Sequence, residues 1–139
     1  MLFRSIQEFA VNPKSRRLAF LACLTTFHAI DYLAPPGSKP NKGNLLKRFR
    51  SESAEFAVME RVACAFKHVK TGKPDTPANQ PLASGDLIAR PPGTWGEAVW
   101  GLSNWGDLVG GVSLDQHRTV DLLATVRAAA RFIRAQSTH

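Results

Sequence analysis

Apolar residues recur every three or four positions in several stretches of this chain, the spacing that places them on one face of an α-helix. The clearest case is Phe56, Met59 and Ala63, which follow Ser53, a favourable N-cap residue. The same periodicity predicts helices over about 2–11, 16–33, 45–50, 54–70 and 115–135. The chain is therefore expected to be mainly helical.

The stretch 16–33 differs from the others because it is apolar on nearly every side. A helix that is hydrophobic all round is normally buried at the centre of a core. Ser15 is placed to cap its start, and the run 34–40, rich in proline and containing a glycine, ends it. We expect this helix to be the central one of the core.

Helical periodicity disappears between residues 82 and 114, where glycine and proline are frequent. Short runs of strand-forming residues occur at 87–89, 98–100 and 108–109, with Val112 just beyond. These runs predict a β-hairpin or a small meander. The expected fold class is mainly α, a small helical bundle of three principal helices plus short ones, with the β segment inserted before the last helix.

The length of 139 residues and the apolar content of 44% are ordinary for one globular domain, which we expect to span 1–139. Lys and Arg outnumber Asp and Glu 18 to 11, which gives a net charge of +7. The basic excess is concentrated in 39–73, whereas 74–113 is mildly acidic. Such a charge favours an anionic partner, nucleic acid or a membrane surface, and a merely solvated basic surface is an equal alternative.

The basic residues of interest fall into two groups. Those that we expect to contact nucleic acid are Lys47, Arg48, Arg50, Lys67 and Lys70. A second group, Arg127, Arg131 and Arg134, lies at i, i+4 and i+7 on the last predicted helix. A row of this kind is usually a solvated face near the negative end of the helix dipole, and we interpret it in that way.

Three tryptophans, each followed by glycine, recur every five residues at Trp95, Trp100 and Trp105. A period of five matches neither a strand nor a helix, so one continuous element cannot align the three rings. In one interpretation the tryptophans fix the β segment to the bundle, with glycine supplying turns. In another they form an aromatic surface for bases or sugars. A small-molecule pocket beneath the segment is a third.

Cys23 and Cys64, the two cysteines of the chain, fall in apolar predicted helices, which favours core thiols in a reducing compartment. A disulfide joining the two helices is the alternative. The four histidines are scattered and lack the spacing of zinc ligands, and no glycine-rich phosphate loop occurs. We therefore expect neither a metal nor a cofactor.

An export signal competes with a cytoplasmic location, because Lys14, Arg16 and Arg17 precede the apolar run 18–24. However, no small-x-small cleavage site follows, and the run continues to Leu33 with the pattern of a core helix. The run is also too short and too polar to span a membrane. We expect a cytoplasmic protein without a membrane partner.

Polar residues on the two most apolar predicted helices need partners, because an unpaired charge inside a core is costly. His28 and Asp31 lie three residues apart and share a helix face. Arg61 and His68 lie seven apart and share another. In a structural interpretation, Asp31 pairs with Arg61 or with Lys67 and locks two helices together.

In a functional interpretation the same residues line a cleft. His68 acts as general acid or base and Arg61 holds a phosphate. Asp31 orients an arginine or a histidine such as His28. This set suffices to cleave RNA without a metal, because the RNA 2′-hydroxyl is the nucleophile, and it would not suit DNA.

The segment from Arg61 to His68, near the end of a long helix in a helical bundle, resembles the Arg-x(4–6)-His motif of HEPN-type domains. These helical domains occur in bacterial toxins and defence systems, and many are metal-independent ribonucleases. The resemblance implies an active site formed across a homodimer, with Arg61 and His68 contributed by both copies. Val62 stands where the family commonly has a polar residue. The chain is also similar to small bacterial helical proteins with a Lys-His pair at that helix end, here Lys67 and His68.

Two hypotheses follow for the function. The first is a HEPN-like domain acting on RNA, a metal-independent endoribonuclease with catalytic residues Arg61, His68, Asp31 and His28. The second is a non-catalytic module that binds nucleic acid or a protein partner. In the second hypothesis Arg61 and His68 are core or interface residues.

Overall fold

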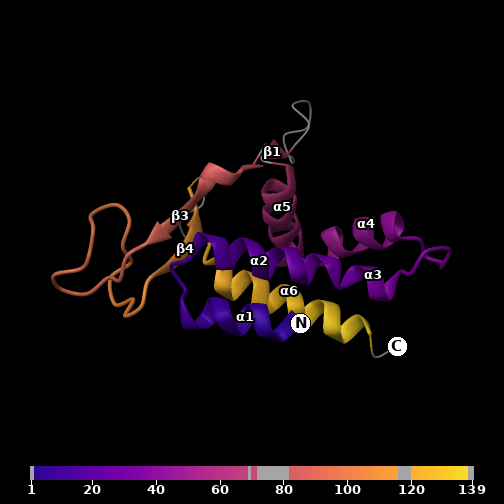
Figure 1. Ribbon diagram of the computed structural model, residues 1–139, viewed down its shortest axis with the longest axis horizontal. Helices are drawn as coiled ribbons and strands as arrows, with labels where there is room; N and C mark the ends of the chain where they lie inside the picture. Colours follow the sequence, from indigo (N-terminus) through magenta and orange to yellow (C-terminus); the bar gives the residue numbers. More distant parts are fainter. Residues whose placement is uncertain (1, 69, 72–81, 116–119, 138–139) are drawn as a thin grey trace.

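The computed structural model describes residues 2–68, 70–71, 82–115 and 120–137. It is mainly helical with a small antiparallel strand pair before the last helix (Figure 1), so the predicted fold class is confirmed. The helices are α1 (Leu2–Val11), α2 (Arg16–His28), α3 (Ile30–Leu33), α4 (Lys42–Glu52), α5 (Ala54–His68) and α6 (Leu122–Gln136). The strands are β1 (Lys70–Thr71), β2 (Leu82–Ala83), β3 (Leu87–Arg90) and β4 (Gly111–Leu114), and a 3₁₀ turn, η2 (Ser84–Asp86), precedes β3.

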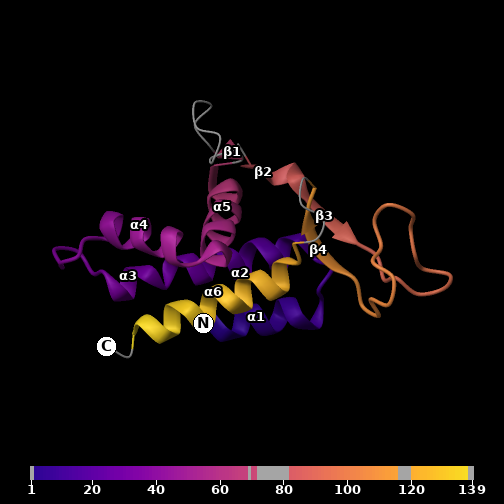
Figure 2. The ribbon, with the colours of Figure 1, turned by 180° about the vertical axis from the view of Figure 1, so that it is seen from behind.

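The core lies where α1, α2 and α6 run side by side and α5 crosses α2 and α6 steeply (Figures 1 and 2). Helix α2 contacts each of the other three, as its nearly all-round apolar pattern predicts. Its buried residues are Ala19, Phe20, Ala22, Cys23 and Thr26. We refer to α1–α6 together as the helical body.

A cluster of phenylalanine rings joins α4, α5 and α6. Phe49 meets Phe56 and Phe132 edge to face, with ring centroids 5.4 and 5.0 Å apart. Phe49 and Phe56 are fully buried. Because such a ring pair adds about 1 kcal/mol to the free energy gained by burying its area, this cluster holds α4 against the rest of the helical body.

The predicted helix 16–33 is interrupted at Ala29, which separates α2 from α3. Thr25 and Thr26 each donate a side-chain hydrogen bond to a backbone carbonyl one turn earlier, at 2.9 and 2.7 Å. Such bonds compete with the helical hydrogen bonds and often bend a helix. The backbone N–H of Ala29 then bonds to the carbonyl of Thr26 at 3.2 Å, which tightens the last turn of α2.

Three other predicted boundaries are shifted. Helix α4 starts before the predicted residue 45, because the Asn41 side chain accepts a backbone hydrogen bond at its N-terminus. Helix α5 stops short of the predicted residue 70, where β1 begins. Helix α6 starts later than the predicted residue 115, at the point where the Asp121 side chain caps it.

Strands β3 and β4 pair antiparallel, with Arg90 opposite Gly111 at the end of the pair where the connecting loop begins and ends. Strands β1 and β2 form a second antiparallel pair. The first predicted strand is confirmed by β3, and Val112 lies in β4. The strands predicted at 98–100 and 108–109 are wrong, because both segments lie in the long loop between β3 and β4 and pair with no strand among the described residues.

The loop between β3 and β4, residues 91–110, extends away from the helical body at the end opposite α3 and α4 (Figures 1 and 2). We call it the tryptophan arm. It consists of three consecutive turns, in which the backbone N–H groups of Glu97, Leu102 and Asp107 donate to the carbonyl three residues earlier at 3.2, 3.1 and 3.1 Å.

The three turns explain the five-residue repeat. In each of them tryptophan is the second residue and glycine the third, with the glycine at φ 85°, 76° and 84° in chain order. A positive φ at the third position is the arrangement of a type II turn, which favours glycine there. One turn of four residues plus one connecting residue gives the period of five.

Candidate functional site

The candidates on α5 and β1 run from the middle of α5 to the strand that follows it. Arg61 is half-buried on α5, His68 is the last residue of that helix, and Lys70 is the first residue of β1. Both Arg61 and His68 therefore belong to one helix, as their spacing predicts. The side chains of Lys67, His68 and Lys70 lie outside the described residues.

His28 and Asp31 meet, as their spacing predicts, with Nδ1 of His28 3.1 Å from Oδ2 of Asp31. The other carboxylate oxygen, Oδ1, accepts a hydrogen bond from Nζ of Lys42 on α4. Asp31 pairs with Lys42 where a pair with Arg61 was predicted, because the chain reverses between α3 and α4 and brings Lys42 to the carboxylate. The other predicted partner, Lys67, has its side chain outside the described residues. The hydrogen bonds from Lys42 and then from His28 hold the pKa of Asp31 below its ordinary value, so it is ionised at neutral pH.

This cluster of His28, Asp31 and Lys42 is open to solvent, with side chains between 39% and 50% exposed. It lies beside the α3–α4 connection at the end of the helical body farthest from the tryptophan arm (Figures 1 and 2). The C-terminal end of α5 lies instead beside β1. The structure therefore places the His28–Asp31 pair and the end of α5 in different parts of the helical body.

Two of the three basic candidates on α4 make contacts that stabilise the fold. The guanidinium of Arg50 donates to both carboxylate oxygens of Glu60 on α5, each at 2.6 Å, and the Glu60 side chain is only 8% exposed. This hydrogen bonding raises the pKa of Arg50. Arg48 donates to Gln136 at the end of α6, at 3.3 Å. Lys47 is exposed and has no ion-pair partner in the part of the chain that the structure describes.

A groove of about 300 Å³ lies between α1 and α6. Buried Ile6 and Ala130 supply apolar surface to it, and Arg127, Arg131 and Arg134 line it with exposed side chains. Within the described ranges, Arg127 and Arg131 have no hydrogen-bond or ion-pair partner. The interpretation of this row as a plain solvated face missed the groove, because the groove depends on how α1 packs beside α6.

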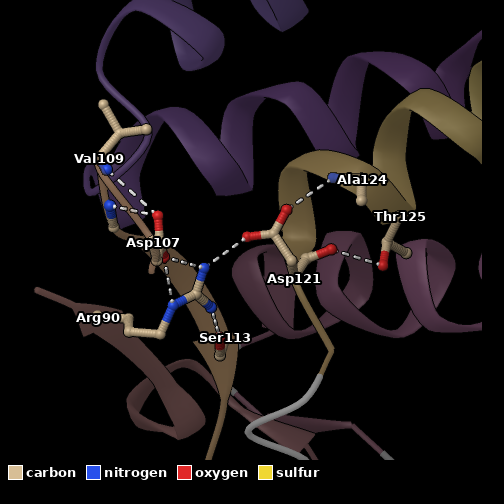
Figure 3. A network of polar contacts seen from close by, with 8 residues as sticks. Arg90, Asp107, Val109, Ser113, Asp121, Ala124 and Thr125 are labelled. Atoms are coloured by element: carbon tan, nitrogen blue, oxygen red, sulfur yellow. Dashed lines mark hydrogen bonds and ion pairs between the residues drawn. The ribbon is translucent and has the colours of Figure 1, made fainter. Parts of the chain in front are cut away.

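A buried arginine, Arg90, fastens the tryptophan arm to the helical body (Figure 3). Its guanidinium donates to Oδ2 of Asp107 at 3.2 and 3.1 Å and to Oδ1 of Asp121 at 3.2 Å. It also donates to the hydroxyl of Ser113 on β4. Since Asp121 caps α6, one guanidinium connects β3, the end of the arm, β4 and the first turn of α6.

The second carboxylate oxygen of Asp107 binds the backbone at the end of the arm. This oxygen, Oδ1, accepts the backbone N–H groups of Val109 at 3.2 Å and of Gly110 at 3.0 Å (Figure 3). Burial by itself raises the pKa of Asp107, but the hydrogen bonds from Gly110, Val109 and Arg90 together lower it below its ordinary value. Asp107 is therefore ionised at neutral pH and balances the charge of Arg90.

The tryptophans of the arm do not pack against the helical body, since Trp95, Trp100 and Trp105 are 92%, 90% and 64% exposed. The interpretation that they fix the β segment to the bundle is wrong, and Arg90 has that role. The ring centroid of Trp105 lies 5.9 Å from that of Trp95 and 6.4 Å from that of Trp100, at interplanar angles of 62° and 79°. The three rings line a pocket of about 230 Å³.

Comparisons of the chain with known proteins do not indicate a function. No family model, curated protein or solved structure matches the chain. The resemblance of Arg61 and His68 to the HEPN motif therefore stays a prediction. In the described ranges, no three His, Cys, Asp or Glu side chains are grouped so as to hold a metal ion, and no helix has the length and apolar character needed to cross a membrane.

The two cysteines are free thiols, so the alternative of a disulfide is not realised. Cys23 is fully buried, and burial raises the pKa of its thiol to about 12. The thiol stays protonated and behaves as a small apolar side chain in the core, as expected. Cys64 is half-buried on α5.

The anchoring role of Arg90 and Asp107 was missed by reasoning from the sequence. One feature of the sequence pointed to the role of Arg90: no Lys or Arg occurs in 91–117 of this otherwise basic chain. Arg90 is therefore the last basic residue before a long acidic stretch, where several carboxylates compete for it. A second signal was the Trp-Gly pair, which fits the second and third positions of a type II turn.

Proposed function

We propose that this chain is a non-catalytic module that binds nucleic acid along the groove between α1 and α6. The observation that supports this proposal is the row of exposed guanidinium groups at Arg127, Arg131 and Arg134. Arg127 and Arg131 have no polar partner among the described residues, and both border a concave surface. Such groups are available to phosphates.

The distribution of charge favours the helical body as the surface that attracts an anionic polymer. Residues 2–68 have eleven Lys and Arg against five acidic residues, and 120–137 have three against one. Residues 82–115 have one Arg against four acidic residues. A positive potential over the body draws phosphates toward it and speeds association, whereas the tryptophan arm adds nothing to that attraction.

The groove has the side chains that a strand of nucleic acid needs. A guanidinium holds phosphate by two parallel hydrogen bonds, and the rise of 1.5 Å per residue places successive arginines of the row about 4.5 to 6 Å apart along α6. Ile6 and Ala130 offer apolar surface to a sugar or base beside them. Arg50 and Arg90 are unsuited to this task, because Arg50 already pairs with buried Glu60 and Arg90 is itself buried and pairs with Asp107 and Asp121.

Binding without catalysis is favoured over the ribonuclease hypothesis by the placement of the predicted catalytic residues. The His28–Asp31 pair and the end of α5 lie in different parts of the helical body, and Asp31 is already bound to Lys42. A ribonuclease that uses Arg61 and His68 across a homodimer stays the second prediction, and an RNA cleavage assay tests it separately.

Fluorescence anisotropy with labelled single-stranded RNA, and with DNA of the same sequence, tests the binding proposal. Arg127→Gln/Arg131→Gln should weaken RNA binding at least tenfold and reduce the salt dependence by about 1.4 in log–log slope, because two phosphate contacts are lost. The matched control, Lys39→Gln/Lys47→Gln, removes the same charge from exposed residues at the α3–α4 end and should change affinity less than about threefold. Equal losses in both double variants would show diffuse attraction and no groove site.

The same RNA, incubated in EDTA and examined on a gel, separates a binding module from a ribonuclease. We expect intact RNA with the wild type and with His68→Ala, both folded. Cleavage by the wild type that disappears in His68→Ala, at an unchanged melting temperature, would replace the binding module with a metal-independent ribonuclease.

A further inference from the structure

The pocket of the tryptophan arm has steep aromatic walls. Trp105 meets Trp95 at 62° and Trp100 at 79°, and all three rings line the same space of about 230 Å³. A flat platform would suit stacked bases. Walls at steep angles suit a compact group that contacts several rings at once, and the small volume admits little more than one such group.

The hydroxyls that line this pocket are already engaged within the arm. Thr94 donates to the carboxylate of Glu97 at 3.0 Å, and Ser103 accepts the backbone N–H of Val99 at 2.8 Å. A sugar would need several directional hydrogen bonds from such groups. The pocket is therefore better matched to a ligand group that makes no hydrogen bonds of its own.

The charge of the arm favours a cation in this pocket. No Lys or Arg occurs in 91–117, whereas the arm has Glu97 and Asp107. The arginine that directly precedes the arm in the sequence, Arg90, is buried and paired with two carboxylates. An anionic group such as phosphate would find no basic side chain in the pocket lining. Because Asp107 is paired with Arg90, the cation is attracted by Glu97 and by tryptophan, the aromatic side chain that binds cations best.

We infer that the tryptophan arm binds a quaternary ammonium group between Trp95, Trp100 and Trp105, with Glu97 supplying negative charge. A quaternary ammonium has a full positive charge and no N–H donor, so it fits aromatic walls whose two lining hydroxyls are hydrogen-bonded within the arm. Choline, the side chain of trimethylated lysine and a phosphocholine headgroup share this chemistry. The inference is independent of the nucleic-acid groove, which lies on other elements of the chain.

Isothermal titration calorimetry with choline, and with its uncharged isostere 3,3-dimethylbutan-1-ol, tests the inference. Choline should bind with a dissociation constant of about 1 mM or tighter, and the isostere should bind at least tenfold more weakly, because it lacks the charge. Trimethyl-lysine and short-chain phosphocholine, titrated in the same way, distinguish the sources. The acidic arm should make phosphocholine the weakest of the three, because its phosphate is repelled.

Variants locate the site. Trp105→Ala should weaken choline binding at least tenfold, because Trp105 contacts both other rings. Glu97→Gln should weaken it about threefold without changing the affinity of the uncharged isostere. Leu108→Ala is the matched control, since Leu108 is an exposed apolar residue of the same arm outside the pocket lining, and it should leave the affinity unchanged. All three side chains are exposed, so melting temperatures should not move.

Two outcomes would overturn the inference. Equal binding of choline and of its uncharged isostere would make this an apolar pocket with no preference for a cation. No binding of choline, trimethyl-lysine or phosphocholine by the folded protein would leave the exposed rings to a partner of different chemistry.

Discussion

Aromatic rings meet edge to face in two regions of this molecule, with opposite exposure. In the helical body Phe49 and Phe56 are fully buried, and their ring centroids lie 5.4 Å apart. In the tryptophan arm Trp95 and Trp100 are 92% and 90% exposed, and they meet Trp105 at 62° and 79°. The phenylalanines gain free energy by leaving water, whereas the tryptophans stay in contact with it and are available to a ligand.

The tryptophan arm keeps its shape without a hydrophobic core of its own. Three turns set its course, and the guanidinium of Arg90 ties its end to β4 and α6. A partly buried network of charged groups here replaces the apolar burial that holds the helices together. The two regions should therefore respond to different perturbations, with the helical body sensitive to loss of ring volume and the arm sensitive to loss of charge.

The largest effect is expected from emptying the buried ring cluster. Phe56→Ala should lower the free energy of unfolding by about 4 kcal/mol, because it removes a fully buried ring and leaves a cavity. Trp100→Ala should change it by less than about 0.5 kcal/mol. Unfolding in urea, followed by circular dichroism at 222 nm, measures both. A large loss in Trp100→Ala would show that the arm contributes to the core.

A smaller effect, confined to the arm, is expected from Arg90→Met. The substitution leaves Asp107 and Asp121 without their shared guanidinium and should cost about 3 kcal/mol. Hydrogen exchange should rise over 91–110 and stay unchanged in α5. Arg17→Met, which removes an exposed arginine of α2, is the matched control and should alter neither region. Unchanged exchange in Arg90→Met would mean that the turns alone hold the arm.

The mildest perturbation is acid. The pKa of Asp107 is lowered in the folded protein, so its contribution to anchoring is fully present above the ordinary aspartate value of about 3.9 and is lost as pH falls through the lowered pKa. Tryptophan emission should be constant from about pH 7 to 5 and should shift below about 3.9.

Two variants assign this acid transition to one region. Asp107→Asn should remove it, whereas Asp31→Asn, which deletes the other carboxylate with a lowered pKa, should leave it in place because Asp31 lies at the far end of the helical body. A transition that survives in Asp107→Asn would belong to groups other than the anchor of the arm.

The positions of the helices could be read from the sequence because a helix is a local structure with a local signature. The apolar period around Phe56 and Met59 located α5, and the all-round apolar run 16–33 marked the centre of the core. The break at Ala29 could not be predicted, because the apolar pattern continues through it. It accompanies the side-chain hydrogen bonds that Thr25 and Thr26 donate to the backbone, and the sequence does not show whether these bonds form.

Contacts between side chains on different helices and strands could not be predicted from the sequence. Asp31 was expected to pair with α5 and pairs with Lys42, because the turn between α3 and α4 decides which cation reaches the carboxylate. Arg50 was a candidate for nucleic acid and is instead the partner of buried Glu60. The exposure of the tryptophans was equally hidden, since large aromatic side chains are mostly buried and these three lie instead in the turns of an extended loop.

The register of β3 against β4 has a consequence for how this protein can change. Because Arg90 and Gly111 face each other, the chain leaves and re-enters the β3–β4 pair at one point, so residues 91–110 can be replaced as a unit. Replacing 91–110 with a two-residue hairpin turn would leave Arg90 its bonds to Ser113 and Asp121. New loops can be grafted at the same point without refolding the helices, so ligand preference and scaffold stability are free to diverge independently.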